Sequence, residues 1–233
     1  MKYVFGVDIG GTTVKIGLFD VEGNVLDKWE IPTRTENDGE KILPDVADSI
    51  REKMKQMDKD AIAGVGVGAP GPIDAGGVVH RAVNLGWKTF NVKETLEALI
   101  NLPVRAGNDA NVAALGEMWM GGGKGYKDLV VVTLGTGVGG GIIVDGRMIS
   151  GSTGAAGEIG HIHVDDTETD ICNCGNKGCL EQFASATGIT RLANKKLAST
   201  DMDSVLRGGE VSAKTVFDAV KARDPLAMEL SLI

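Results

Sequence analysis

One pattern occurs twice in this chain and constrains its fold more than any other feature. Residues 3–24 contain an apolar strand, a turn of glycine and threonine, a second apolar strand and an acidic–glycine turn. Residues 129–146 contain the same elements in the same order. A unit that occurs twice predicts two related lobes. We place an N-terminal α/β lobe over residues 1–118 and a larger α/β lobe over residues 119–233.

The order of strand and helix patterns predicts the fold class. Apolar runs predict strands over residues 3–9, 14–19, 25–31, 62–68, 103–107, 129–134 and 141–144. Apolar residues at helical spacing predict a helix over residues 39–57. A capping box of Asn91 and Glu94 predicts a second helix over 91–100, and the NDAN segment starts a third over 108–119. Because helices follow strands in this order, we expect a mixed α/β sheet. Asp224 and Pro225 start another helix nine residues before the last residue, so we expect a chain cut inside an element.

Composition narrows the class of function. The formal net charge is −8, from 24 Lys and Arg against 32 Asp and Glu. This charge disfavours nonspecific binding to nucleic acid or to an anionic membrane. The sequence has no signal peptide pattern and no apolar run of the roughly eighteen residues that a membrane span needs. We therefore expect a cytoplasmic protein that acts on small molecules.

All three cysteines lie in one glycine-containing segment. Cys172, Cys174 and Cys179 have the spacing Cys-x-Cys-x4-Cys, and His161 precedes the first of them by eleven residues. Three thiolates and one imidazole are typical of a closed structural zinc site, which holds a loop and does not activate water. The alternative is three buried thiols that pack as small hydrophobic groups.

The two glycine–threonine turns are candidates for phosphate binding. In the first, Gly10 and Gly11 let the main chain approach an anion, and Thr12 adds a hydroxyl. Asp8 is a candidate ligand for magnesium, and Lys15 is a candidate to neutralise nearby charge. The second turn consists of Gly135, Thr136 and Gly137. Either turn alone is also consistent with a tight hairpin, but two in corresponding places favour a clamp on the phosphates of one nucleotide.

Four polar residues are candidates for substrate binding and catalysis. Asp109 is a candidate base that accepts a hydroxyl proton, with Asn108 bonding a neighbouring hydroxyl. The alternative for both residues is capping of the helix that follows. Glu158 and Glu181 flank the cysteine segment, where a bound metal would fix them to accept hydrogen bonds from sugar hydroxyls. The alternative is two solvated acids.

Six motifs follow one another in an order known from one family. They are DIGGTTVKIG at 8, GAPGPID at 68, GNDAN at 107, LGTGVGGG at 134, GEIGHI at 157 and CNCGNKGCLE at 172. Together they resemble the ROK family of sugar kinases and repressors, and look most like its bacterial glucokinases. The resemblance implies a two-lobed actin-like ATPase fold of the ribonuclease H-like type with mixed sheets. It also implies transfer of the ATP γ-phosphate to the 6-hydroxyl of a hexose.

The resemblance assigns roles to individual residues. The catalytic base would be Asp109, and the sugar contacts would be Asn108, Asp109, Glu158, His161 and Glu181. The zinc ligands would be His161, Cys172, Cys174 and Cys179. The phosphate and magnesium region would contain Asp8, Gly10, Gly11, Thr12, Gly135, Thr136 and Gly137. The implied cofactors are ATP, magnesium and structural zinc, and a homodimer is usual for the family. Family members continue further, through a glycine-rich segment near adenosine, which implies that this chain is truncated at its C-terminus.

Three other functions stay open at this point. The first is a kinase for another hexose: N-acetylglucosamine, N-acetylmannosamine, mannose or fructose. The second is a transcriptional repressor, which is disfavoured because a helix-turn-helix domain would precede the strand that starts at residue 3. The third is a noncatalytic sugar sensor, which Asp109 and the phosphate turns argue against.

Overall fold

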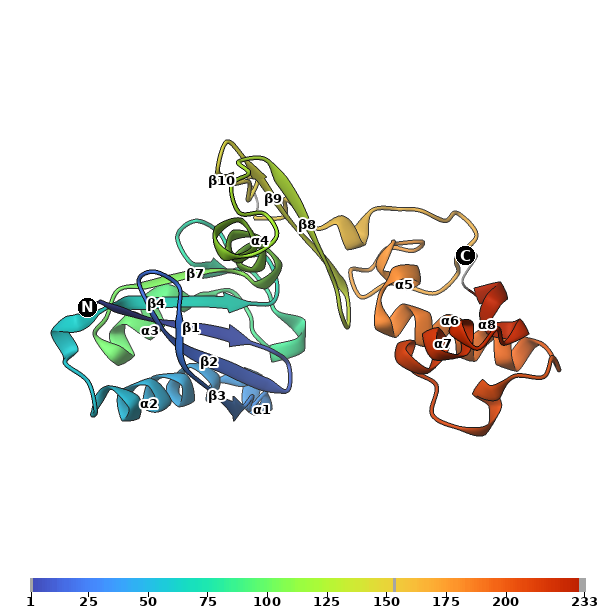
Figure 1. Cartoon of the computed structure of the whole chain (residues 1–233), viewed down its shortest axis with the longest axis horizontal. Helices are drawn as coiled ribbons and strands as arrows, with labels where there is room; N and C mark the ends of the chain where they lie inside the picture. The colour runs from blue at the N-terminus through green and yellow to red at the C-terminus, as the bar shows by residue number, and fades with distance from the viewer. Residues whose placement is uncertain (1, 153, 231–233) are drawn as a thin grey trace. The chain divides into compact units, whose positions relative to one another are not determined.

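The computed structural model describes residues 2–152 and 154–230 (Figure 1). The contacts within the chain divide it into two compact units, Met1–Val131 with Gly141–Gly157, and Val132–Gly140 with Glu158–Ile233. A lobe boundary at residue 118 stays a prediction. Among the described residues, no helix combines the length and the apolar character that crossing a lipid bilayer requires.

The first unit is built on a five-stranded mixed sheet of order β3-β2-β1-β4-β7. Its strands are β1 (Tyr3–Ile9), β2 (Thr13–Asp20), β3 (Val25–Pro32), β4 (Ile62–Ala69) and β7 (Val104–Asn108). The first three form an antiparallel meander, whereas β4 runs parallel to β1 and β7 runs parallel to β4. These bounds confirm the five predicted strands.

Helices cover both faces of this sheet (Figure 1). The helices of the first unit are α1 (Glu36–Gly39), α2 (Ile42–Met54), α3 (Val92–Ile100) and α4 (Asp109–Met120), with 3-10 turns η1 (Lys59–Ala61) and η2 (Val83–Leu85). On one face, Val46 of α2 and Leu96 of α3 form a core with Val67 of β4. On the other face α4 packs closely, because a Cβ on Gly68 of β4 would lie only 3.6 Å from the Asp109 Cα. Two short strands, β5 (Val78–Val79) and β6 (Phe90–Asn91), form a separate pair.

The predicted helix over residues 39–57 is shorter in the structure, where α2 begins at Ile42 and ends at Met54. Asn37, Asp38 and Gly39 have φ angles of 52°, 59° and 67°, in the left-handed region. A regular right-handed helix cannot pass through such residues, so α2 starts after them, and α1 is a single turn with non-helical backbone at Asn37 and Asp38.

The second repeat forms a three-stranded sheet of order β10-β9-β8. Its strands are β8 (Leu129–Leu134), β9 (Val138–Val144) and β10 (Arg147–Met148). Strand β9 begins three residues earlier than the predicted strand over residues 141–144. The turn is tight, with the Gly135 amide donating to the Gly137 carbonyl at 3.0 Å, and the chain is therefore extended again from Val138.

This sheet is shared between the two units, because residues 132–140 belong to the second unit and the rest of the sheet to the first. All helices after β10 belong to the second unit. Its helices are α5 (Glu181–Ala184), α6 (Ala186–Ser199), α7 (Ala213–Lys221) and α8 (Pro225–Leu230), with 3-10 turns η3 (Ile159–His161) and η4 (Val205–Gly208). Leu206, Val216 and Leu226 form a small core between them. The side chain of Asp224 accepts a hydrogen bond from the Ala227 amide at 3.0 Å, which caps α8 as the sequence predicts.

Candidate functional site

The predicted site residues fall into two groups, one in each compact unit. Those in the first unit are Asp8, Gly10, Gly11, Thr12, Lys15, Asn108 and Asp109. Those in the second unit are Gly135, Thr136, Gly137, Glu158, His161, Cys172, Cys174, Cys179 and Glu181.

In the first unit, two carboxylates meet at one edge of the sheet. Asp8 of β1 is in register with Gly68 of β4, and Gly68 is in register with Gly107 of β7. Asp109 is the first residue of α4, directly after β7. The carboxyl ends of parallel strands lie at the same edge, and Asp8 is close enough for its charge to affect the titration of Asp109.

Asp109 has a raised pKa. Its side chain reaches solvent but is surrounded by protein on most sides, and this partial desolvation is the largest cause of the upward shift. The negative charge of Asp8 adds to it, while a hydrogen bond from the Ala110 amide at 2.7 Å acts in the opposite direction. Asp109 therefore has a higher proton affinity than an ordinary aspartate, a property that suits a general base.

Asn108 is buried and caps α4. Its Oδ1 accepts a hydrogen bond from the Asn111 amide at 3.1 Å, and its Nδ2 donates to the Gly71 carbonyl at 3.1 Å. The capping interpretation of Asn108 is thus confirmed. These bonds fix the strand-to-helix junction, so the backbone that carries Asp109 is rigid.

The first glycine–threonine turn is a tight hairpin between β1 and β2. The Gly10 amide donates to the Thr13 carbonyl at 3.0 Å, and the Thr33 hydroxyl donates to the Gly10 carbonyl at 2.7 Å. Gly11 and Thr12 are exposed at its tip. Asp8 and Lys15 are opposite one another in the β1–β2 register, so their side chains lie on the same face of the sheet. The turn is a hairpin whose exposed tip lies beside one acidic and one basic side chain.

In the second unit, the histidine and the three cysteines form one cluster. The ligand atoms of His161, Cys172, Cys174 and Cys179 all lie within 4.8 Å of one another. The Cys174 and Cys179 sulfurs are 3.6 Å apart, and His161 Nδ1 lies 3.7 Å from the Cys172 sulfur. Zn–S bonds of about 2.3 Å in a tetrahedron separate two sulfurs by about 3.8 Å. The spacing and the ligand types therefore fit a tetrahedral zinc ion.

The titration of the three thiols is governed by burial, by backbone hydrogen bonds and by their proximity to one another, and the pKa of Cys174 alone is lowered. Burial, followed by the other two cysteines, raises the pKa of Cys179 to about 12, and burial also raises the pKa of Cys172. A bound cation removes this obstacle, because it stabilises thiolates directly. A metal ion at the centre of the cluster would therefore stabilise the thiolate forms of the cysteines.

The two candidate sugar-binding acids are next to the cluster. His161 Nε2 lies 3.9 Å from Glu158 Oε2, while Nδ1 of the same ring faces Cys172. The carboxylate therefore faces the ring nitrogen that points away from the cysteines, at a separation longer than a hydrogen bond. Glu181 starts α5 two residues after Cys179, and its Oε2 accepts a hydrogen bond from the Val138 amide at 2.9 Å. Glu158 thus lies beside the histidine of the cluster, and Glu181 is held by the first residue of β9.

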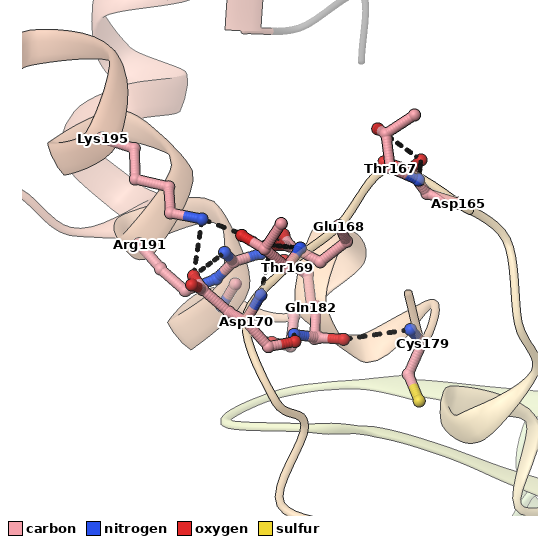
Figure 2. A network of polar contacts seen from close by, with 11 residues as sticks. Asp165, Thr167, Glu168, Thr169, Asp170, Cys179, Gln182, Arg191 and Lys195 are labelled. Carbon is pink, nitrogen blue, oxygen red and sulfur yellow. Dashed lines mark hydrogen bonds and ion pairs between the residues drawn. The ribbon is translucent and has the colours of Figure 1, made fainter. Parts of the chain in front are cut away.

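A polar network anchors this loop to α6 (Figure 2). Glu168 is nearly buried, with 5% of its side chain exposed, and pairs with Arg191 at 2.7 Å and with Lys195 at 3.3 Å. Asp170 pairs with the same two residues at 2.6 Å each. Gln182 joins the network to the cluster, because it donates to the Asp170 carbonyl and accepts from the Cys179 amide. The sequence analysis did not identify this network.

Glu168 has a pKa of about 2. Burial alone raises the pKa, but hydrogen bonds from the Asp170 amide, Arg191 and Lys195 outweigh burial and lower the pKa from its ordinary 4.5. The charged form of Glu168 therefore stabilises the folded state above pH 4.5, and this stabilisation is lost as the pH falls from 4.5 towards 2.

We expect Glu168→Gln to lower the free energy of unfolding at pH 7 by about 2 kcal/mol. The difference in unfolding free energy between the variant and the wild type should shrink below pH 4.5, where Glu168 of the unfolded wild-type chain becomes protonated. Thermal unfolding followed by circular dichroism between pH 7 and pH 3 measures this. Asp201→Asn, at an exposed position of the same unit, is the matched control. A difference that stays constant over this pH range would contradict the assignment.

Comparison with known proteins places these features in a family. The ROK family model matches residues 4–232. A glucokinase of Halalkalibacterium halodurans is 43% identical over 236 residues, which cover 98% of this chain and 72% of that protein. A Streptomyces coelicolor glucokinase is 39% identical over 201 residues, which cover 86% of this chain and 62% of that protein.

Solved structures agree with the sequence matches. The crystal structure of a ROK family glucokinase from Streptomyces griseus, in complex with glucose and AMPPNP, superposes with a TM-score of 0.79 at 34% identity. The match covers 98% of this chain and 74% of that one. The fold is therefore the mixed α/β fold of the actin-like ATPases, with mixed sheets. The chain belongs to the ROK family.

Proposed function

We propose that this chain is an ATP-dependent sugar kinase that makes glucose 6-phosphate from glucose. The observation that carries the proposal is Asp109, a carboxylate with a raised pKa at the sheet edge that also carries Asp8. Two relatives named glucokinase, at 43% and 39% identity, support glucose as the substrate. The glucose and AMPPNP in the Streptomyces griseus structure support both ligands.

Asp109 is proposed to accept the proton of the sugar 6-hydroxyl as that oxygen attacks the γ-phosphate. Asn108 is proposed to bond a neighbouring hydroxyl, since one Nδ2 hydrogen remains after its bond to Gly71. Glu158, His161 and Glu181 are proposed to bind sugar hydroxyls. Each of these side chains is held by its neighbours, and little ordering is then required when sugar binds.

The remaining proposed roles concern ATP and the two metals. Asp8 offers carboxylate oxygens to magnesium, and Lys15 on the same face balances phosphate charge. Gly10, Gly11 and Thr12 in one turn, and Gly135, Thr136 and Gly137 in the other, offer amides and hydroxyls to phosphate. Zinc held by His161 and the three cysteines would fix the shape of the loop that carries the sugar-binding acids.

Calorimetric titration of the 233-residue chain with five sugars tests the proposal: glucose, N-acetylglucosamine, N-acetylmannosamine, mannose and fructose. We expect glucose to bind about tenfold or more tightly than the others, because a site built for a hydroxyl at each position leaves polar groups unpaired with the wrong sugar. Preference for an N-acetylated sugar would instead assign the chain to a kinase for that sugar. No binding of any of the five would refute the sugar-kinase proposal for this chain.

A further inference from the structure

The second glycine–threonine turn, residues 135–137, is held from outside by one continuous segment of the second unit. The Thr187 hydroxyl donates to the Thr136 carbonyl at 2.7 Å, and the Ala186 amide donates to the Gly135 carbonyl at 2.9 Å. Directly after the turn, the Val138 amide donates to Glu181 Oε2 at 2.9 Å. Two of the three carbonyls of the turn, and the first amide after it, thus have partners within residues 181–187.

The packing is tight at the end of this turn, at Gly137 and Val138. A Cβ on Gly137 would lie 2.3 Å from Glu181 Oε2, and a Cβ on Gly160 would lie 2.2 Å from the Val138 carbonyl oxygen. Gly160 lies in η3, between Glu158 and His161. Val138 is therefore in contact both with the segment that carries Glu158 and His161 and with Glu181.

Helix α6 connects the same turn to the cysteine loop. Thr187, Arg191 and Lys195 are spaced four residues apart, so they lie along one stripe of the helix. Thr187 bonds the turn, whereas Arg191 and Lys195 pair with Glu168 and Asp170 ahead of the first cysteine (Figure 2). One stripe of α6 thus contacts both the turn and the loop.

We infer that Glu181 and Thr187 are positioning residues. They couple the cysteine loop, residues 158–181, which carries the proposed sugar-binding acids, to the proposed phosphate-binding turn at residues 135–137. Glu181 has two carboxylate oxygens: Oε2 accepts from the Val138 amide, and Oε1, which has no hydrogen bond within residues 2–152 and 154–230, is proposed to accept from a sugar hydroxyl. A sugar that fixes Glu181 also fixes the start of β9, and a nucleotide then binds to a turn that is already ordered. This coupling rests on the proposed sugar and phosphate roles, whereas the positioning role of Thr187 does not.

Hydrogen exchange of the turn, measured by mass spectrometry on peptides covering residues 134–139, tests the role of Thr187 without ligand. Thr187→Val removes the hydroxyl and keeps the shape of the side chain. We expect this variant to exchange the turn amides about fivefold faster, the effect of losing one hydrogen bond. Thr187→Ser should restore the wild-type rate, because it keeps the hydroxyl.

Thr190→Val is the matched control, since the Thr190 hydroxyl bonds only the Ala186 carbonyl of its own helix among the contacts described. Equal exchange of the turn in wild type, Thr187→Val and Thr190→Val would overturn the positioning role. So would a Thr187→Ser variant that exchanges as fast as Thr187→Val.

Glucose tests the coupling in a separate arm. We expect saturating glucose to slow exchange of the turn in the wild type and to slow it less in Thr187→Val, with the glucose affinity of the two equal by calorimetry. Glucose that binds without slowing exchange of the turn would overturn the coupling. Absence of glucose binding to the wild type would instead count against the proposed function, and the ligand-free comparison of Thr187 variants would still decide the positioning role.

Discussion

Replacing Asp109 by asparagine is expected to lower kcat for glucose phosphorylation by about 10²–10⁴-fold, the usual contribution of a general base. Asparagine has nearly the same shape but cannot accept the hydroxyl proton. Sugar affinity should stay close to that of the wild type, because Asn108, Glu158 and Glu181 are unchanged. Formation of glucose 6-phosphate in a coupled assay at saturating sugar, together with calorimetric titration of glucose, measures both quantities.

The pH profile of the same variant gives a second readout. A base acts only when it is deprotonated, so activity of the wild type should fall as the pH drops through the raised pKa of Asp109, above the ordinary 3.8. The residual activity of Asp109→Asn should lack this acidic limb. Asp60→Asn, at an exposed position of the same unit, is the control and should keep the wild-type profile. Loss of sugar binding with preserved turnover would show that Asp109 binds sugar and is not the base.

The second large effect is expected from Cys174→Ser. Serine supplies a neutral hydroxyl where the proposed zinc site needs a thiolate, so the variant should lose bound zinc. Glucose affinity should fall tenfold or more, on the order of effects seen when metal-site support is removed. The reason is geometric: His161 lies 3.9 Å from Glu158, and Glu181 begins two residues after Cys179. Metal content by atomic emission and glucose affinity by calorimetry are the two measurements.

Asn176→Ser is the matched control for the cysteine variant. Asn176 is exposed in the same loop and is not a member of the ligand cluster. It should keep both zinc and glucose affinity. If zinc-free Cys174→Ser bound glucose as tightly as the wild type, the metal would have no part in shaping the sugar site.

Local patterns were enough to predict most of the first unit. Its five strands were predicted from apolar runs, because a buried strand imposes its pattern on consecutive residues. The start of α2 was predicted wrongly, at 39 instead of Ile42. Left-handed backbone at Asn37 and Asp38 depends on the surrounding structure, and neither residue type requires it.

The clustering of His161 with the three cysteines was also predictable, because metal ligands in one loop have a characteristic spacing. The pairing of Glu168 with Arg191 was not predictable, because the two residues are 23 positions apart in the sequence. Glu and Arg are also residue types that are common on any protein surface. The bond between Glu181 and the Val138 amide spans 43 positions and uses a backbone donor, which leaves no pattern in the sequence. Long-range contacts of this kind become visible only in the folded chain.

The contacts of α6 have a practical consequence for building chimeras within the family. Thr187 and Lys195 are eight residues apart, about 12 Å along a helix, and bond to segments that lie far from each other in the sequence. If only the cysteine loop were transferred from one family member to another, Glu181 and Glu168 of the donor protein would have to pair with the turn and with helix α6 of the recipient protein. Residues 132–140 and 158–199 should therefore be exchanged together, because a recombination junction placed inside either segment would separate residues that bond to one another.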